Sequence, residues 1–368
     1  MKNIPLTRPY ITDEVKAKVS EVLDSGYLTE GLITKEFEDL FKNYVGSQYA
    51  LAICNCTVGL EMALRAMDIG PGDEVIVPDY TYPATASVVE IVGAKIVIVD
   101  VDRETMLIDY EALERSVTPR TRAVIPVSIF GNPLDYERLN KIKEKYNIFV
   151  LEDAACSIGA EFKGLKIGNL ADISVFSLHP RKFITTGEGG ILTTNNGKWA
   201  EWMNSYKHFG MDDNQSRVGI QFARIGTNYK LTNIQAAVGL VQMKYITELL
   251  NKRQLLAKNY VNLLKDNSKV SCQQVSQFGT HSYQSFCIFV KARDNVMSNM
   301  REQGIGVQIG TYSLHMHKAF NKNSNCRIAG DMKGSKYAFE HCLTLPLYHD
   351  LSTDDQEYII EKLTEIIP

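Results

Sequence analysis

One lysine in the sequence stands in a setting that suits covalent chemistry. Lys182 follows the apolar run 173–176 and precedes the stretch Thr185-Thr-Gly-Glu-Gly-Gly190, after which a second apolar run begins at Ile191. This order predicts a turn between two buried strands, and its glycines let another group come close to the backbone. A lysine that forms a Schiff base needs such a setting, because its amine must be held in place and partly desolvated. A glycine-rich turn with a surface lysine has the same spacing, so both interpretations stay open at this point.

A candidate anion site lies nearer the N-terminus. The short strand predicted over 49–54 breaks at Asn55-Cys-Thr57, and a helix is predicted to follow over 58–67. The free N–H groups and the dipole of a helix N-terminus attract an anion. The same pattern allows Asn55 or Thr57 to act only as a helix cap.

Four more apolar runs, separated by helical segments, lie between these two motifs. They are continuous runs, which is typical of parallel strands buried on both faces, and they cover 75–78, 95–101, 123–129 and 147–151. The predicted helices cover 84–92, 109–116 and 135–146. We therefore predict an α/β fold with a mostly parallel central sheet. Thr57, Tyr82 and Asp153 each follow a strand, at the carboxyl edge where such sheets bind ligands.

The remaining segments predict two domains. Hydrophobic periodicity indicates helices over 11–25, with Thr12 as the cap, and over 35–44, 199–210 and 353–366. A polar loop is expected over 211–226, followed by a long helix over 228–267 whose middle marks a domain boundary. This gives a large domain over 1–245 and a small α+β domain over 246–368, and we expect the N-terminal segment to pack on the small domain. The small domain is predicted to contain a strand over 283–290, a helix over 295–303 and an extended segment over 307–312.

The composition excludes several classes of protein. The chain has 368 residues, of which 45% are hydrophobic and 23% are charged, so it is globular and long enough for two domains. Its net charge of -3 gives no electrostatic case for nucleic acid. No apolar run reaches the length of about 18 residues that a membrane span needs, and the first residues lack the apolar core of a signal peptide. The seven cysteines form no CxxC pair or His/Cys cluster, so we expect no metal site and no disulfide framework. These features predict a soluble cytoplasmic protein.

Taken together, the order of phosphate turn, aromatic loop, strand-end aspartate and lysine turn resembles the fold type I pyridoxal phosphate (PLP) enzymes. More narrowly, the chain resembles the DegT/DnrJ/EryC1/StrS family of sugar aminotransferases. The resemblance covers nearly the whole chain, and the lysine stretch is its most specific part. Its other motifs are Ile4-Pro-Leu-Thr-Arg-Pro9, Gly70-Pro-Gly-Asp-Glu-Val-Ile-Val-Pro78, Glu152-Asp-Ala-Ala155, Asn228-Tyr-Lys-Leu231, Gly310-Thr-Tyr-Ser-Leu-His315 and Thr344-Leu-Pro-Leu347.

The resemblance implies a role for each residue around the cofactor. Lys182 would form the Schiff base with PLP and later move the proton, and Asp153 would keep the pyridine nitrogen protonated so that the ring is a better electron sink. Tyr82 would stack on the ring. The Cys56 backbone, Thr57 and Ser177 would hold the phosphate. Alternatively, Asp153 is a helix cap or part of a structural ion pair, and Tyr82 is a packed tyrosine.

Two positions depart from the family pattern. The phosphate turn usually reads Ser-Gly-Thr, whereas here it is Asn55-Cys56-Thr57; the backbone N–H groups remain, so phosphate binding should survive. The family often has Gln or His after the Asp-Ala-Ala run to contact the ring hydroxyl. Cys156 stands there in this chain, and a thiol is a weak donor and acceptor.

The resemblance also implies substrate and partner contacts. Asn228 would complete the phosphate site from the partner subunit of a homodimer with a shared active site. Lys230 would add positive charge there, unless it is simply a solvated lysine. The residues expected to face the substrate are His179, Tyr312 and His315, although each histidine could equally be structural, and His317 competes with His315 for the assignment.

The activity implied is transfer of an amino group, from glutamate, to a nucleotide-linked keto-sugar of the 4-keto-6-deoxy type. Pyridoxamine phosphate would carry the nitrogen between the two half-reactions. Three alternatives remain: an aminotransferase of another small ketone, a sugar 3-dehydratase, and a PLP-binding regulator without catalysis. Dehydratases of the family carry a histidine where Lys182 stands, which disfavours the second alternative.

Overall fold

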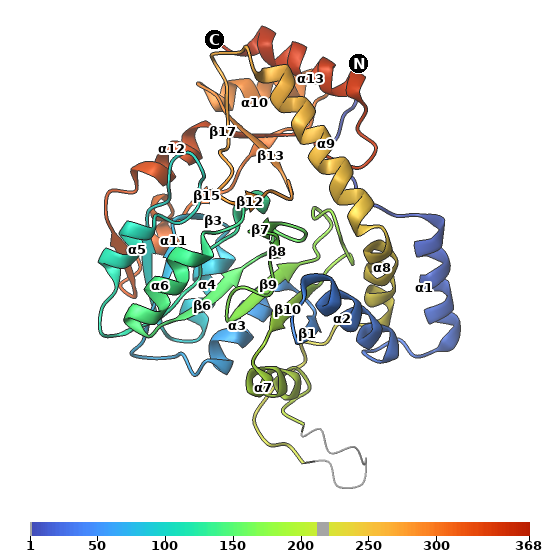
Figure 1. Cartoon of the computed structure of the whole chain (residues 1–368), viewed down its shortest axis with the longest axis vertical. Helices are drawn as coiled ribbons and strands as arrows, with labels where there is room; N and C mark the ends of the chain where they lie inside the picture. The colour runs from blue at the N-terminus through green and yellow to red at the C-terminus, as the bar shows by residue number, and fades with distance from the viewer. Residues whose placement is uncertain (1, 212–220) are drawn as a thin grey trace.

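An eight-stranded sheet forms the centre of the protein, seen in the computed structural model, which describes residues 2–211 and 221–368 (Figure 1). The strand order is β1-β10-β9-β6-β5-β2-β4-β16. The strand β10 is antiparallel to both of its neighbours, and the pairs from β9 to β16 are all parallel. The mostly parallel α/β sheet predicted from the sequence is therefore confirmed. Its strands are β1 (Tyr49–Ile53), β2 (Glu74–Pro78), β4 (Lys95–Val99), β5 (Thr121–Val124), β6 (Phe149–Asp153), β9 (Ile173–Ser177), β10 (Gly190–Thr194) and β16 (Cys326–Ala329).

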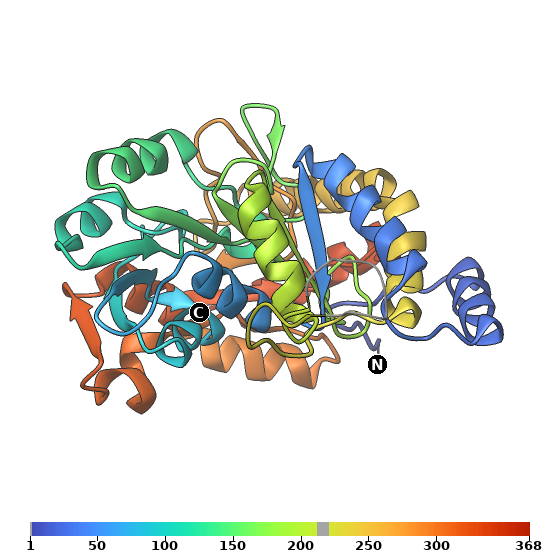
Figure 2. The same ribbon diagram turned by 90° about the horizontal axis from the view of Figure 1, so that it is seen from below.

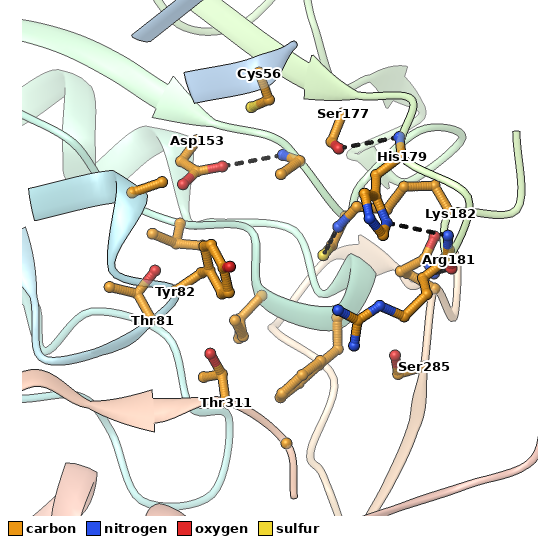
Figure 3. A pocket seen from close by; sticks show the side chains of 18 of the residues that line it. Cys56, Thr81, Tyr82, Asp153, Ser177, His179, Arg181, Lys182, Ser285 and Thr311 are labelled. Atoms are coloured by element: carbon orange, nitrogen blue, oxygen red, sulfur yellow. Dashed lines mark hydrogen bonds between the residues drawn. The ribbon is translucent and has the colours of Figure 1, made fainter. Parts of the chain in front are cut away.

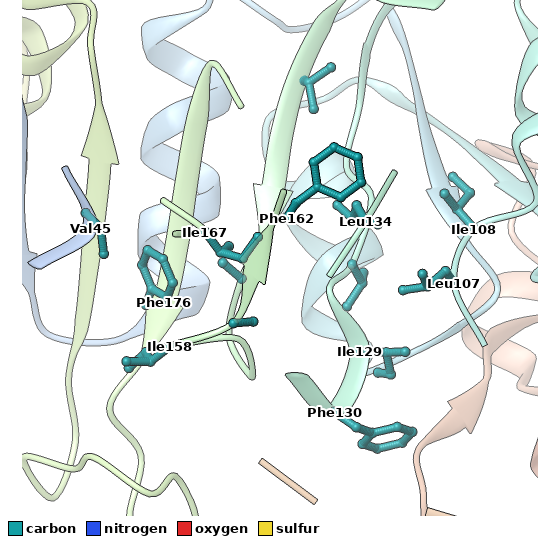
Figure 4. Close-up of a cluster of buried hydrophobic side chains, with 14 of the residues drawn as sticks. Val45, Leu107, Ile108, Ile129, Phe130, Leu134, Ile158, Phe162, Ile167 and Phe176 are labelled. Atoms are coloured by element: carbon teal, nitrogen blue, oxygen red, sulfur yellow. The ribbon is translucent and has the colours of Figure 1, made fainter. Parts of the chain in front are cut away.

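Helices cover both faces of this sheet (Figures 1 and 2). Successive strand residues point to opposite faces, so Ile76 of β2 lies in one apolar cluster and Val77 in the other. Part of the first cluster is drawn in Figure 4. The helices over the first cluster are α2 (Leu32–Val45), α5 (Tyr110–Ser116), α6 (Tyr136–Tyr146) and α8 (Asn233–Lys244). The helices over the second are α3 (Cys56–Ala66), α4 (Ala84–Ile91) and α7 (Gly197–Lys207). Burial on both faces explains why the strands read as continuous apolar runs.

The single long helix predicted over 228–267 is wrong. The chain stays extended to Lys230, and α8 begins only at Asn233. A capping box marks this start of the helix. In it, Thr232 Oγ1 accepts a hydrogen bond from Gln235 N, and the Gln235 side chain accepts one from Thr232 N. A break at Tyr245 then separates α8 from α9 (Ile246–Leu264). The Tyr245 hydroxyl donates to Glu14 Oε2 at 2.6 Å, which ties this break to α1 (Asp13–Ser25). Thr12 caps α1, as predicted.

A smaller sheet and three helices build a third apolar cluster near the C-terminus (Figure 1). Ile4 belongs to this cluster, Ile4 pairs with Ile305, and Leu347 N donates to Leu6 O at 3.0 Å, so the N-terminal segment packs here. The strands are β11 (Ser271–Cys272), β13 (Phe286–Phe289), β14 (Gln308–Ile309) and β17 (Cys342–Leu345), and the helices are α9, α10 (Arg293–Glu302) and α13 (Thr353–Ile366). The division of the chain at residue 245 stays a prediction.

Two C-terminal strands join the large sheet region, which the sequence pattern did not predict. The strand β16 extends the central sheet at its edge, parallel to β4. The strand β15 (Tyr312–Ser313) pairs with β3 (Tyr80–Thr81) just beyond β2. The other short elements are β7 (Glu161–Phe162), β8 (Leu165–Lys166), β12 (Gly279–Thr280), the 3-10 turns η1 (Ile129–Gly131) and η2 (Leu314–Met316), and the helices α11 (Lys318–Asn321) and α12 (Lys333–His341).

Two further observations complete the fold. Across residues 2–211 and 221–368, no helix combines the length and the apolar composition that crossing a bilayer requires. The polar loop predicted over 211–226 falls for the most part outside the described residues; its described ends meet in a bridge between Met211 and Phe222.

Candidate active site

Eight of the predicted site residues line a single cavity of about 650 Å³. The cavity lies at the carboxyl ends of β6 and β9 and at the start of α3, and Figure 3 shows its residues at close range. This volume is typical of a site for a small ligand. The eight residues are Cys56, Thr57, Tyr82, Asp153, Cys156, Ser177, His179 and Lys182.

Lys182 lies in the loop between the antiparallel strands β9 and β10, as predicted, and the ends of this loop are fixed. Ser177 pairs with Gly190 across its base, and Thr185 Oγ1 donates to Leu178 O at 2.8 Å. Gly190 has a packing role as well: a Cβ there would lie 2.8 Å from Cys56 N. Only glycine lets the lysine loop approach the turn at the start of α3 this closely.

The amine of Lys182 lies inside the cavity and has a sulfur partner. Its Nζ donates to Cys156 Sγ at 3.0 Å. Burial acts to lower the pKa of this amine, but the nearby Cys156, Cys56 and Asp153 outweigh that effect, and the net pKa is raised above its ordinary value. The cavity therefore favours a positive charge at the position of this nitrogen.

Asp153 ends β6 as a buried carboxylate with a single side-chain donor. The Thr85 hydroxyl donates to Asp153 Oδ2 at 2.7 Å, and Ala155 N donates to Oδ1 at 3.2 Å. Burial raises the pKa of Asp153, and these donors and Lys182 oppose the rise only in part. A carboxylate in this state gains from a cationic N–H partner in the cavity.

The predicted phosphate turn opens α3 directly. The helix begins at Cys56, two residues earlier than predicted, and Asn55 Oδ1 accepts from Val58 N at 3.0 Å. Asn55 is thus the helix cap. A side-chain cap satisfies only part of the first turn of N–H groups, which leaves others of this 11-residue helix for an anion. Ser177, at the end of β9, adds a hydroxyl near Cys56 at the start of α3 (Figure 3).

Tyr82 lies on the cavity wall with 61% of its surface exposed. Its ring contacts that of Tyr312, with centroids 6.3 Å apart. A tyrosine packed in the core would be buried, so this exposure favours a ring that is available to stack on a ligand.

Four predicted residues lie outside the cavity lining. Asn228 and Lys230 belong to an extended segment beside β1, where Lys230 pairs with Ile53. The Lys230 ammonium lies 5.0 Å from the Phe209 ring, and burial lowers its pKa. The other two predicted residues are Tyr312 and His315.

His315 has a strong structural partner. Its Nδ1 is 2.6 Å from Asp79 Oδ2, and its backbone N donates to Asp79 Oδ1 at 2.7 Å. Asp79 is completely buried, so this pair fastens η2 to the end of β2. The substrate roles of Tyr312 and His315 stay predictions.

Sequence reasoning missed several lining residues and one supporting residue. Arg181, inside the lysine motif, was the easiest to find, since it neighbours Lys182. Gln284 comes from the C-terminal part of the chain and holds the lysine loop, because its Oε1 accepts from Phe183 N at 3.1 Å. Thr85, the donor to Asp153, supports the site without lining the cavity. The other missed lining residues include Glu188, Ser285 and Thr311.

The residues of the cavity fit PLP. A partly buried lysine amine, a buried carboxylate that forms no ion pair within residues 2–211 and 221–368, and a helix N-terminus face one space. These groups suit the aldehyde, the ring nitrogen and the phosphate of that cofactor. Cys156, next to the amine, is one of the two departures from the usual set.

Comparison with known proteins agrees with this chemistry. The model of the DegT/DnrJ/EryC1/StrS aminotransferase family matches residues 9–364. The uncharacterized protein MJ1066 of Methanocaldococcus jannaschii is 33% identical over 377 residues, covering 99% of this chain and 97% of that protein.

Two solved structures have the same fold. A Streptococcus pneumoniae protein in its PLP form is 28% identical with a TM-score of 0.92, covering 99% of this chain and 98% of that one. Helicobacter pylori PseC, an aminotransferase involved in the biosynthesis of pseudoaminic acid, is 25% identical with a TM-score of 0.94, covering 100% of this chain and 99% of that one. The chain thus belongs to the DegT/DnrJ/EryC1/StrS aminotransferase family and is a PLP-dependent aminotransferase of fold type I.

Proposed function

We propose that the protein moves an amino group from glutamate to the keto group of a nucleotide-linked sugar of the 4-keto-6-deoxy type. The observation that carries the proposal is the Lys182 amine, which faces the same cavity as Asp153 and the start of α3. A sugar as the acceptor is supported by the family and by the similar Streptococcus pneumoniae protein, which is described as a putative sugar aminotransferase. The nucleotide and a role in polysaccharide biosynthesis are further parts of the proposal.

The residues of the chain divide the work of this reaction. PLP, when bound, supplies an electron sink for the carbanion that forms when the donor loses its α-hydrogen. Lys182 Nζ takes that proton and returns it, which is general acid–base catalysis by a held amine. The Asp153 carboxylate would keep a proton on the ring nitrogen. The N–H groups that open α3 and the Ser177 hydroxyl would hold the phosphate, and Tyr82 would stack on the ring.

The acceptor can be tested in a single half-reaction. The protein is loaded with pyridoxamine phosphate and mixed with keto-sugar nucleotides, and the loss of the amine form is followed by absorbance. We expect loss with a 4-keto-6-deoxy sugar nucleotide and none with the matched sugar that lacks the ketone. If only small ketones that are not sugars discharge the amine, the sugar assignment is wrong. A deoxy sugar as product, in place of an amino sugar, would favour the dehydratase alternative.

We also propose a homodimer in which the partner supplies Asn228 to the phosphate site. In support, the loop 26–31 lies close to the segment 222–230, since Glu30 Oε1 is 3.0 Å from His208 Nε2 and His208 pairs with Asn228. Their large apolar side chains are exposed, up to 80% for Tyr27 and 96% for Ile225. An exposed apolar surface of this kind is typical of an interface.

A mixture of two inactive variants tests this arrangement. Lys182→Ala and Asn228→Ala should each impair the site, but they do so in different subunits of a shared site. A dimer that contains one subunit of each variant should therefore have one intact site. Random pairing makes about half of the dimers such hybrids, so co-expression should restore about a quarter of the wild-type rate. No gain over the separate variants would contradict the shared site.

A further inference from the structure

A second cation projects into the cavity beside the catalytic lysine. Arg181 precedes Lys182 in the loop, is exposed and lines the cavity. Figure 3 shows its guanidinium extending toward Ser285 and Thr311. Its backbone is fixed on both sides, because its N donates to His179 Nδ1 at 3.2 Å and its O accepts from Gln284 Nε2 at 2.8 Å.

This guanidinium has no anion of its own. No carboxylate in the described part of the chain forms an ion pair with it. Of the two carboxylates in the described lining, Asp153 is held by Thr85, and Glu188 lies 3.9 Å from His179 Nε2. Arg181 and Lys182 are the arginine and lysine side chains of that lining, and Lys182 would be occupied by the cofactor. The cavity therefore keeps one guanidinium, which can form two parallel hydrogen bonds, for an anionic ligand.

We propose that Arg181 binds the α-carboxylate of the amino donor. The inference rests on the proposed function, since it gives a role in the first half-reaction to a residue of the same site. The donor must bring its nitrogen to the position of Lys182 Nζ, and its α-carboxylate is joined to the carbon that bears this nitrogen. Arg181 and Lys182 line the same cavity, so the guanidinium is available to an anionic group of a donor that binds there.

The neighbours of Arg181 suit this role. Burial lowers the pKa of His179. The negative charge of Glu188 raises this pKa, but the positive charges of Arg181 and Lys182 lower it, and the net pKa is below its ordinary value. A neutral His179 accepts the hydrogen bond from Arg181 N, which fixes the start of the arginine side chain. Ser285, on the side to which the guanidinium extends, offers a hydroxyl to the same carboxylate (Figure 3).

The test uses the PLP-loaded protein and 2-methylglutamate, which lacks the α-hydrogen and so binds without transferring its nitrogen. Binding is titrated by the change in cofactor absorbance. Arg181→Gln should weaken the binding of 2-methylglutamate about 10- to 100-fold, as the loss of charged hydrogen bonds predicts. The affinity of Arg181→Lys should lie between those of Arg181→Gln and the wild type. The matched control is Arg115→Gln, at an exposed arginine outside the cavity lining, which should bind as wild type does.

The second half-reaction completes the test. The pyridoxamine phosphate form of Arg181→Gln should discharge onto its keto-sugar within about twofold of the wild-type rate. Unchanged binding of 2-methylglutamate would overturn the proposal, and so would a loss confined to the keto-sugar step. Because the titration contains no keto-sugar, a wrong acceptor assignment leaves its result unchanged, and the two failures are distinguishable.

Discussion

Replacing Lys182 with alanine should lower the rate of amino transfer at least about 10³-fold, since a positioned acid–base group and nucleophile contribute on that scale. The side chain lies in a loop that is fixed by backbone contacts, such as that between Thr185 Oγ1 and Leu178 O. The fold should therefore survive the change. Single-turnover rates with glutamate measure the effect, and circular dichroism checks the fold.

The control for this variant is Lys198→Ala, at an exposed lysine in the first turn of α7. It should transfer nitrogen at the wild-type rate. If Lys182→Ala also turned over at the wild-type rate, Lys182 would not be the catalytic base.

Asp153→Asn should lower the rate of transfer about 10²- to 10³-fold. An amide of the same shape cannot balance the charge of a protonated ring nitrogen, and leaving a buried cation unpaired costs about 3–5 kcal/mol. Single-turnover rates at saturating glutamate measure this loss. Thr85→Val is the matched variant, because it removes one donor to Asp153 and keeps the carboxylate; its loss should be clearly smaller. Equal rates for Asp153→Asn and wild type would contradict the role.

The same variant has a predicted effect on stability with the opposite sign. Burial raises the pKa of Asp153 in the folded protein above its unfolded value. At pH values above the unfolded pKa, the ionised carboxylate therefore destabilises the fold without cofactor. Asp153→Asn should leave the melting temperature of the cofactor-free protein unchanged or higher at pH 7, and it should reduce the stabilisation that PLP provides.

Much of this architecture could be predicted from the sequence because it is local. The parallel strands read as apolar runs, and the lysine loop carries its own glycines and threonines. The strand β16 could not be found, since it has only four residues, which are half-buried or exposed at the sheet edge. The break at Tyr245 was also hidden, because helix propensity continues through it while a contact with Glu14 fixes it.

The site was predictable to the same extent. Lys182 and Asp153 were found from motifs that end strands, and the structure places both at one cavity. The donor Thr85 carries no pattern, since it reaches Asp153 only through the packing of α4. The pairing of His315 with Asp79 joins residues 236 positions apart, so no local pattern could show it.

The attachment point of the cofactor tests the central claim most directly. The PLP-loaded protein is reduced with borohydride and digested, and the modified peptide is identified by mass spectrometry. We expect the cofactor mass on Lys182 alone. Attachment to another lysine, such as Lys207, which is buried between Glu30 and Glu38, or no attachment at all, would contradict the account.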